Sequence, residues 1–330
     1  YCDFLSAPAD ADIRRRYVEA LIEEIKIKSQ TYKDYSVPTI FIGGGTPSVL
    51  AGVYIAQIME AVYASFSVEK TAEITIECNP GTLNTEKAVH YKHAGINRIS
   101  LGLQSARNEE LKLLGRIHTF EQFLISYDLL RKAGFDNINV DLMSGLPYQQ
   151  LSDWEYSLKK TVSLHPEHIS AYGLIIEEGT PFYEHFGADE RRREEGLTPL
   201  LLPSEEAERE MYVWTEEYLF RHGYRHYEIS NYARPGRECR HNIGYWKREN
   251  YLGLGLGSAS LVENVRFSNT SDLNSYLRGE GWDPKTIREH IILDRQAQME
   301  EFMFLGLRLT GGVRTAEFER RFGVAMEAVY

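Results

Sequence analysis

The stretch TIFIGGGTPS, residues 39–48, joins a short apolar run to three consecutive glycines. The apolar run is typical of a strand buried in a sheet. The glycines at its end let a ligand approach the backbone closely and leave N–H groups free to bind it. No Gly-Lys-Ser/Thr follows, which excludes a Walker-type phosphate loop. The stretch therefore predicts a strand whose carboxyl end carries a ligand-binding loop.

Strands and helices alternate along the chain on both sides of this loop. Repeated units of this length imply parallel strands joined by right-handed helical crossovers, and hence an open or closed α/β barrel. About six units fit before residue 230, fewer than the eight of a full barrel. The predicted helices are 10–30, 53–66, 85–94, 107–114, 119–133, 151–164 and 204–221, and the predicted strands are 38–42, 72–78, 96–103, 137–142 and 168–174.

The alternation stops after Tyr227. Residues 228–260 are rich in glycine, asparagine and aromatic residues, which predicts loops with short strands. The pattern becomes helical again from residue 286. The sequence therefore predicts two regions, a barrel over residues 1–230 and a smaller C-terminal region over residues 231–330.

Composition excludes several classes of protein. No apolar run approaches the length of a membrane span. The net charge of −11 argues against a general nucleic-acid binder, which would carry a basic excess. Three cysteines are a small and odd number, which argues against a disulfide framework. Such a set favours metal ligation or buried thiols in a reducing compartment such as the cytoplasm.

Polar side chains stand where the predicted strands end. Glu77, Gln104 and Asp141 close three successive strands, and Arg116 lies in the loop 114–118, after the helix that follows the second of them. Sites in α/β barrels gather at the carboxyl ends of the strands. Two carboxylates, an amide and a guanidinium supply the donors and acceptors that an amino-acid group and a ribose require. The pattern predicts a binding site for such a ligand at this end of the barrel.

Cys2 stands in the tetrapeptide Tyr-Cys-Asp-Phe, one βα unit before the glycine loop. A Cys-Asp-Phe tripeptide followed by GGGTPS resembles the radical S-adenosylmethionine (SAM) enzymes. In that superfamily three cysteines spaced CxxxCxxC hold a 4Fe–4S cluster. The resemblance makes Cys2 the third cluster ligand, with the other two expected upstream of Tyr1.

Five further motifs narrow the resemblance to one branch of that superfamily. It is the branch that contains oxygen-independent coproporphyrinogen III oxidase and the haem chaperone HemW. The resemblance implies a partial (β/α)6 TIM-like barrel of the radical SAM type with a smaller C-terminal region. The motifs are TIECNP (75–80), ISLGLQS (99–105), LLGRIHT (113–119), NVDLMSGLP (139–147) and SAYGLIIEEGTPFY (170–183).

The same resemblance implies roles for individual residues. Side chains at the strand ends would contact SAM, the glycine loop would bind its methionine end, and the backbone after the fifth strand would lie near its adenine. The implied SAM contacts are Glu77, Gln104, Arg116 and Asp141; the methionine-end residues are Gly44, Gly45 and Thr46; and the adenine neighbours are Tyr172 and Gly173.

Two features separate the members of this branch. The oxidase carries a further cysteine two residues after the third ligand, where this chain has Phe4. The motif HNxxYW at residues 241–246, like YEISNYA at 227–233, resembles the HemW signature. Imidazole is a common axial ligand of haem iron, so His241 is a candidate haem ligand. The alternative is a histidine satisfied within a polar loop, and the neighbouring Cys239 is either a ligand or a buried thiol.

The resemblance therefore implies a HemW-like haem chaperone. Such a protein would bind haem and a SAM-ligated 4Fe–4S cluster and deliver haem to acceptor haemoproteins, respiratory and membrane-associated ones among them. The alternative is an enzyme, a coproporphyrinogen III dehydrogenase that converts two propionates to vinyl groups with loss of CO2. Phe4 and the HNxxYW motif favour the chaperone.

Overall fold

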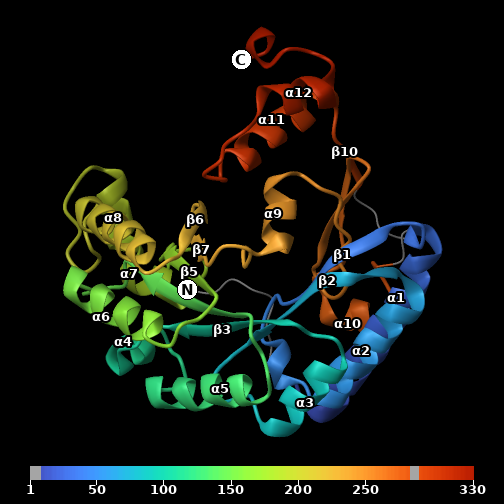
Figure 1. Ribbon diagram of the computed structural model, residues 1–330, viewed down its shortest axis with the longest axis horizontal. Coiled ribbons are helices and arrows are strands. Elements are labelled where there is room, and N and C mark those ends of the chain that lie inside the picture. The colour runs from blue at the N-terminus through green and yellow to red at the C-terminus, as the bar shows by residue number, and fades with distance from the viewer. Residues whose placement is uncertain (1–8, 283–289) are drawn as a thin grey trace.

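The computed structural model describes residues 9–282 and 290–330, and its centre is a seven-stranded sheet curled into an open barrel (Figure 1). The strand order is β1-β2-β3-β4-β5-β7-β6. Strands β1 to β5 are parallel, β7 is antiparallel to both of its neighbours β5 and β6, and β6 therefore runs in the same direction as β1 to β5. The strands are β1 (Ser36–Ile42), β2 (Ser67–Cys78), β3 (Arg98–Gln104), β4 (Ile138–Ser144), β5 (His168–Gly173), β6 (Arg225–Glu228) and β7 (Asn231–Ala233).

Helices cover the outer face of this sheet (Figure 1). Apolar residues at alternate strand positions, such as Ile76, Leu101 and Val140, are fully buried against the helices in the main core. The intervening positions face the inside of the curl, and several of them are polar, such as Ser100, Asn139 and His168. The helices are α1 (Ala11–Tyr32), α2 (Gly52–Ser65), α3 (Thr85–His93), α4 (Asn108–Leu113), α5 (Phe120–Lys132), α6 (Leu151–Val162), α7 (Pro181–Glu194) and α8 (Glu205–Arg221), with a short 3-10 turn η1 (Pro47–Val49) after the glycine loop.

The predicted fold class, a partial radical-SAM-type barrel with a smaller C-terminal region, is confirmed. Among the described residues, five adjacent strands pair in parallel, not about six, because the sixth place in the sheet is taken by β7. This strand runs back through a tight turn at residues 229–230 after β6, so it can pair with β5 only in the antiparallel sense. The predicted division at residue 230 falls inside this hairpin, so the sheet continues a few residues beyond it.

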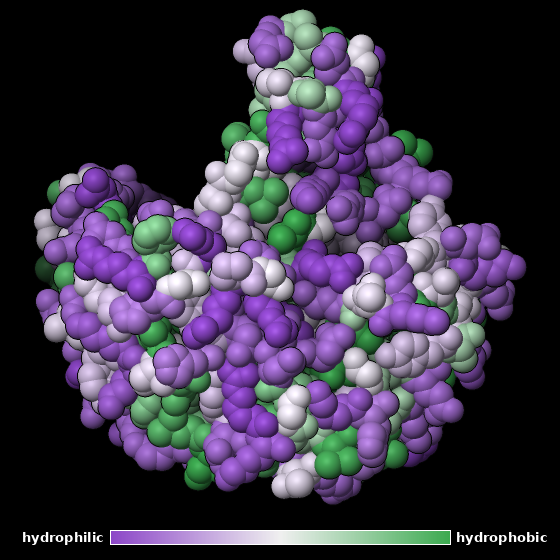
Figure 2. Space-filling model, in the orientation of Figure 1, coloured by the Kyte–Doolittle hydropathy of each residue, from purple (hydrophilic) through white to green (hydrophobic). Residues whose placement is uncertain are grey.

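The C-terminal region consists of a three-stranded antiparallel sheet and several short helices. Figure 2 shows a notch between the lobe that contains α8 and the protruding C-terminal helices. The backbone of Leu309 pairs with Glu228, which covers the outer edge of β6. The elements are α9 (Arg240–Trp246), β8 (Ala259–Val262), β9 (Val265–Ser268), α10 (Leu273–Leu277), β10 (His290–Ile292), α11 (Arg295–Gly306), α12 (Thr315–Phe322) and the 3-10 turn η2 (Met326–Ala328).

The prediction of loops and short strands over residues 228–260 was wrong at α9. This helix has only seven residues and buries none of them fully, so its sequence carries no apolar period from which a helix could be predicted. A tertiary contact stabilises it instead. The backbone N–H groups of Arg240 and His241 donate to the carboxylate of Glu73 on β2, each at 3.1 Å. A carboxylate at a helix N-terminus satisfies donors that the helix itself leaves unpaired.

A fully buried ion pair joins the C-terminal region to the barrel. Glu24 and Lys28 lie one turn apart on α1, 2.8 Å from each other, and neither side chain is exposed. Lys28 also donates to the Asn269 side chain, and Glu24 accepts from the Tyr276 hydroxyl and the Gly255 N–H. Because every charged atom has partners from the C-terminal region, the pair fixes that region against α1.

We expect Lys28→Ala to destabilise the protein by about 3–5 kcal/mol, because it leaves the Glu24 carboxylate buried without its cation. Chemical denaturation followed by circular dichroism measures the loss. The double variant Glu24→Gln/Lys28→Met, which removes both charges, should recover much of it. A single variant as stable as the unmodified protein would contradict this account of the junction.

Candidate functional site

The residues predicted to bind SAM lie around the carboxyl ends of the parallel strands. The Gly44 N–H, in the loop after β1, donates to Glu77 Oε2 at the end of β2, over 3.2 Å. Asp141 on β4 lies close enough to Glu77 to raise the pKa of that carboxyl, and it has the same effect on the hydroxyl of Tyr172 on β5. Strand ends from β1 to β5 therefore line one edge of the barrel, as the sequence predicted.

The glycine loop forms an open cradle at this edge. Gly44 has a φ of 83°, in the left-handed region that favours glycine, and no atom lies within 4 Å of the position that a side chain would take there or at Gly45. Gly43 has no room for a side chain, because a Cβ there would lie 2.8 Å from the carboxyl carbon of Glu77. The loop therefore presents bare backbone to a ligand on one side and packs against Glu77 on the other.

Glu77 is the electrostatic centre of the site. Burial and the neighbouring Asp141 carboxylate raise its pKa to about 7, although the Gly44 N–H opposes the shift. Both carboxylate oxygens of Asp141 are hydrogen-bonded, one to the Ser100 hydroxyl (3.0 Å) and the other to the Asn139 amide (2.7 Å). Two carboxylates held close together favour a positively charged ligand group.

Asn79 connects the glycine loop to Arg116. Its side-chain amide donates to Thr46 Oγ1 at 3.0 Å, and its carbonyl oxygen accepts from Arg116 Nη1 at 3.2 Å. Asn79 stands above only within the motif TIECNP, and these two contacts were not predicted from the sequence. A polar residue two positions after Glu77, at the same strand end, was the signal that could have identified it.

Gln104 reaches the site through an irregular strand end. Its φ is 70°, an uncommon value for a residue other than glycine, and the register of β3 against β4 shifts between Gly102 and Gln104. A side chain at Gly102 would crowd both Asn79 and Gln104, at 3.2 Å from each. The bulge and the glycine together give the Gln104 amide room at this edge, where it is buried beside Asn79.

At the end of β5, Gly173 is exposed and no atom lies within 4 Å of the position a Cβ would take. The preceding Tyr172 exposes 38% of its surface. Burial of its hydroxyl, together with Asp141 and Glu228, raises the pKa of that hydroxyl, so it stays protonated. The backbone at Tyr172 and Gly173 is accessible on the side predicted to lie near adenine.

His241 does not come from a strand end; it lies on α9, against the inner face of β1. Its ring stacks on Phe41, Nδ1 lies 2.9 Å from Thr39 Oγ1, and Nε2 lies 3.0 Å from the Tyr245 hydroxyl. Burial lowers the pKa of the imidazole to about 4, so the ring is neutral at physiological pH. Both ring nitrogens therefore have partners within the protein.

The cysteines divide into two groups. Cys2, the predicted third cluster ligand, lies outside the described residues. Cys78 and Cys239 are buried free thiols, and burial raises the pKa of both.

Within residues 9–282 and 290–330, no three histidine, cysteine, aspartate or glutamate side chains are grouped so that they could hold a metal ion. In the same residues, every helix is too short or too polar to span a membrane.

Comparison with known proteins identifies the family. The Radical SAM superfamily model matches residues 1–160, and the HemN C-terminal domain model matches residues 293–330. The chain is 38% identical to the heme chaperone HemW of Lactococcus lactis subsp. lactis (strain IL1403), a match that spans the whole chain and 83% of that protein. It belongs to the HemW family. The Bacillus subtilis (strain 168) heme chaperone HemW is 34% identical, over the whole chain and 85% of that relative.

Among solved structures, coproporphyrinogen III oxidase (HemN) from Escherichia coli, described as a radical SAM enzyme, has the same fold. The TM-score is 0.80, the sequence identity is 22%, and the likeness covers 98% of this chain and 75% of the other. This likeness establishes the fold of the barrel and its C-terminal region.

Membership of the radical SAM superfamily implies a 4Fe–4S cluster and SAM, and the strand ends fit SAM. The Glu77–Asp141 pair suits the ammonium group, and the bare backbone at Gly44 and Gly45 has room for the methionine portion. The Arg116 guanidinium, held by Asn79, suits a carboxylate. Among the residues that the structure describes, the site therefore carries groups complementary to the ammonium and carboxylate groups of SAM.

The raised pKa of Glu77 makes the binding of SAM depend on pH. We expect SAM to bind about tenfold more weakly at about pH 6 than at about pH 8, because a carboxyl group with a pKa near 7 is mostly protonated one unit below it and cannot pair with an ammonium group. Equilibrium dialysis of the full-length, anaerobically reconstituted protein with labelled SAM measures this.

Glu77→Gln provides the matched control, since the amide keeps the shape of the side chain and does not titrate. In that variant the affinity should be weak at both pH values. An unmodified protein whose affinity is the same at both pH values would contradict the assignment of Glu77 to the ammonium group.

Proposed function

We propose that this protein is a haem chaperone that binds haem beside a SAM-ligated 4Fe–4S cluster and delivers haem to acceptor haemoproteins. The observation that carries the proposal is the 38% identity, over the whole chain, to a protein named heme chaperone HemW. The neutral His241 on α9 and the open cradle at the strand ends support it, since they provide a candidate haem ligand and a SAM site in one barrel.

In this proposal Cys2 is the third thiolate of the cluster, and two cysteines upstream of Tyr1 are the others. A cluster held by three thiolates leaves one iron open to another ligand, and the amino and carboxylate groups of SAM can occupy it. The residues of this chain orient SAM: Glu77 and Asp141 at its ammonium group, and Arg116 at its carboxylate. Gln104 contacts it from β3.

Iron coordination by His241 requires one hydrogen bond to be exchanged. Nε2 of His241 is hydrogen-bonded to the Tyr245 hydroxyl at 3.0 Å, and Nδ1 is hydrogen-bonded to Thr39 Oγ1 at 2.9 Å. Tyr245 is the more easily displaced partner, because it lies on the same short helix, whereas Thr39 belongs to the central sheet. We propose that haem iron replaces the Tyr245 hydroxyl at Nε2.

The test is an anaerobic haem titration of the full-length protein, followed by Soret absorbance. We expect one-to-one binding that is lost in His241→Ala and retained in His185→Ala, a control at an exposed histidine of α7. Tyr245→Phe should bind haem at least as tightly as the unmodified protein, because it removes the competing hydroxyl. A tyrosine needed only for structure would give weaker binding.

Two results would change the proposal. Unaltered binding in His241→Ala would retain the chaperone function and place the iron ligand elsewhere. Absence of binding in the unmodified protein would contradict the chaperone function itself. The alternative function is that of a coproporphyrinogen III dehydrogenase, and the observation behind it is the fold shared with the Escherichia coli enzyme. Anaerobic conversion of coproporphyrinogen III by the reconstituted protein would support this alternative.

Acceptors are the remaining part of the proposal. We propose that haem passes to haemoproteins, including membrane-associated respiratory ones, by direct contact. Transfer from the haem-loaded protein to an apo-cytochrome, followed by the shift of the Soret band, tests this. Transfer at the rate of free haem release would contradict a direct hand-over.

A further inference from the structure

Arg308 lies two residues beyond the end of α11, beside the last residue of the HNxxYW motif. Its side chain forms no ion pair and no hydrogen bond with the residues that the structure describes. Nε is buried without a partner, whereas Nη1 and Nη2 are not buried. The two terminal nitrogens of this guanidinium are therefore free to bind an anion.

Three neighbouring arginines have partners within the chain. Arg248 and Arg266 bind the two carboxylate oxygens of Glu301, each at 2.8 Å. Arg321 donates to two backbone carbonyls just after α9. Burial weakens the hydration of a cation, so a half-buried guanidinium without an anion is costly. An anionic ligand at Arg308 would remove that cost.

The Arg308 guanidinium is held in position before any ligand binds. Its central carbon lies 4.3 Å from the centre of the Trp246 ring, a cation–π contact. The Arg308 carbonyl accepts from the Ile229 N–H at 3.2 Å, and the Arg308 N–H donates to the Leu305 carbonyl at 3.1 Å. A group fixed in advance loses little conformational entropy on binding.

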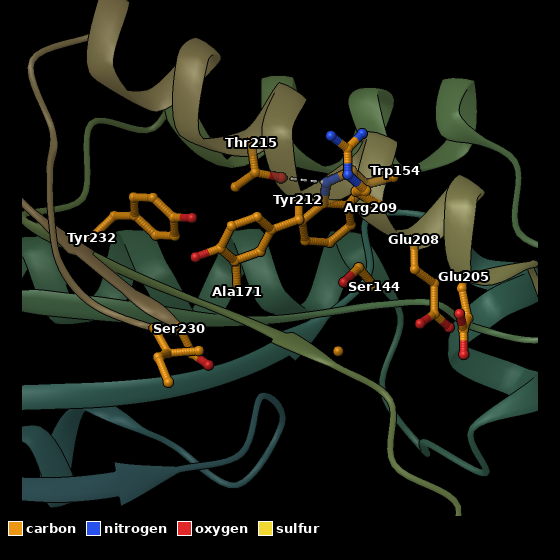
Figure 3. Close-up of a pocket in the computed structure, with 12 residues that line it drawn as sticks. Ser144, Trp154, Ala171, Glu205, Glu208, Arg209, Tyr212, Thr215, Ser230 and Tyr232 are labelled. Atoms are coloured by element: carbon orange, nitrogen blue, oxygen red, sulfur yellow. Dashed lines mark hydrogen bonds between the residues drawn. The ribbon is translucent and has the colours of Figure 1, made fainter. Parts of the chain in front are cut away.

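The α8 side of the notch has a different character. A hollow there, with Arg209 at its rim, includes the turn at residues 229–230 in its wall (Figure 3). Arg209 lies 3.6 Å from Glu206 on its own helix, so its charge is already paired. Arg308 bonds to the same turn from the C-terminal side of the notch. An anion is therefore better accommodated on the C-terminal side.

Exposed apolar side chains stand next to Arg308 at the end of α11. Phe304 exposes 58% of its surface, and Leu307 exposes 63%. Exposed apolar surface beside a cation suits a ligand that has both an apolar body and a carboxylate. Haem is such a ligand, since its porphyrin ring bears two propionate groups.

Trp246 links Arg308 to the candidate haem ligand. His241 and Trp246 lie five residues apart on α9, which places their Cα atoms about 9 Å from each other. The iron ligand is thus near the start of this helix, and the ring that supports Arg308 is at its end. A haem whose iron binds His241 can extend its propionate edge toward Arg308.

We propose that Arg308 binds a haem propionate. Nη1 and Nη2 pair with the carboxylate, the Trp246 ring keeps the guanidinium in place, and Phe304 and Leu307 border the porphyrin edge. This inference rests on the proposed function, because it takes haem as the ligand.

Anaerobic titration of the full-length protein with haem and with haem dimethyl ester, followed by Soret absorbance, tests the proposal. The ester keeps the iron and removes both propionate charges. We expect the unmodified protein to bind haem at least about tenfold more tightly than the ester, because charge-assisted pairs are the stronger ones. Arg308→Gln should lose about that factor for haem and bind the ester with unchanged affinity. Arg320→Gln, at an exposed arginine of α12, is the matched control and should behave as the unmodified protein does.

The outcomes separate this inference from the haem-chaperone proposal. Equal affinity of the unmodified protein for haem and its ester, a comparison that needs no variant, overturns the role of Arg308 and leaves haem binding intact. Unaltered haem affinity in Arg308→Gln does the same. An equal loss for both ligands in that variant shows a structural role and also overturns the inference. Absence of haem binding in the unmodified protein overturns both proposals.

Discussion

The carboxylate of Glu73 holds the two regions of the protein together. From the inner face of β2 it accepts the backbone N–H groups of Arg240 and His241, each at 3.1 Å, and so fixes the start of α9 inside the open barrel. Just after the other end of α9, Arg248 pairs with Glu301 of α11 at 2.8 Å, and both side chains are buried. The HNxxYW motif thus lies on a helix that is tied to the barrel at one end and to the C-terminal helices at the other.

The outer face of the barrel sheet is apolar and the inner face is largely polar. The outer face stabilises the fold, and the inner face leads to the candidate site. The outer face buries aliphatic side chains under the helices, while the inner face presents polar residues such as Ser100, Asn139 and His168. Asn139 links Ser100 and His168 by hydrogen bonds of 2.8 Å and 2.6 Å. A polar inner face is costly to bury unless it is fully paired, and these networks keep the site edge rigid.

Much of the site was predictable because strand ends are predictable. Glu77 and Asp141 each follow an apolar strand, and parallel strands bring their carboxyl ends to one edge, so their proximity followed from the pattern. Asn79 was missed because a polar residue before Pro-Gly is typical of any turn. The inward position of His241 was missed because a contact with Glu73, 168 residues away, decides it.

The sequence by itself determined the alternation of strands and helices, the glycine loop, the residues at the strand ends and the family. These are local features, since period, turn residues and motifs depend on neighbours in the chain. Only the tertiary structure decided that the sixth place in the sheet is antiparallel, that α9 forms, and that both nitrogens of His241 are occupied. Each of these depends on contacts between segments far apart in sequence, whose energies no local pattern contains.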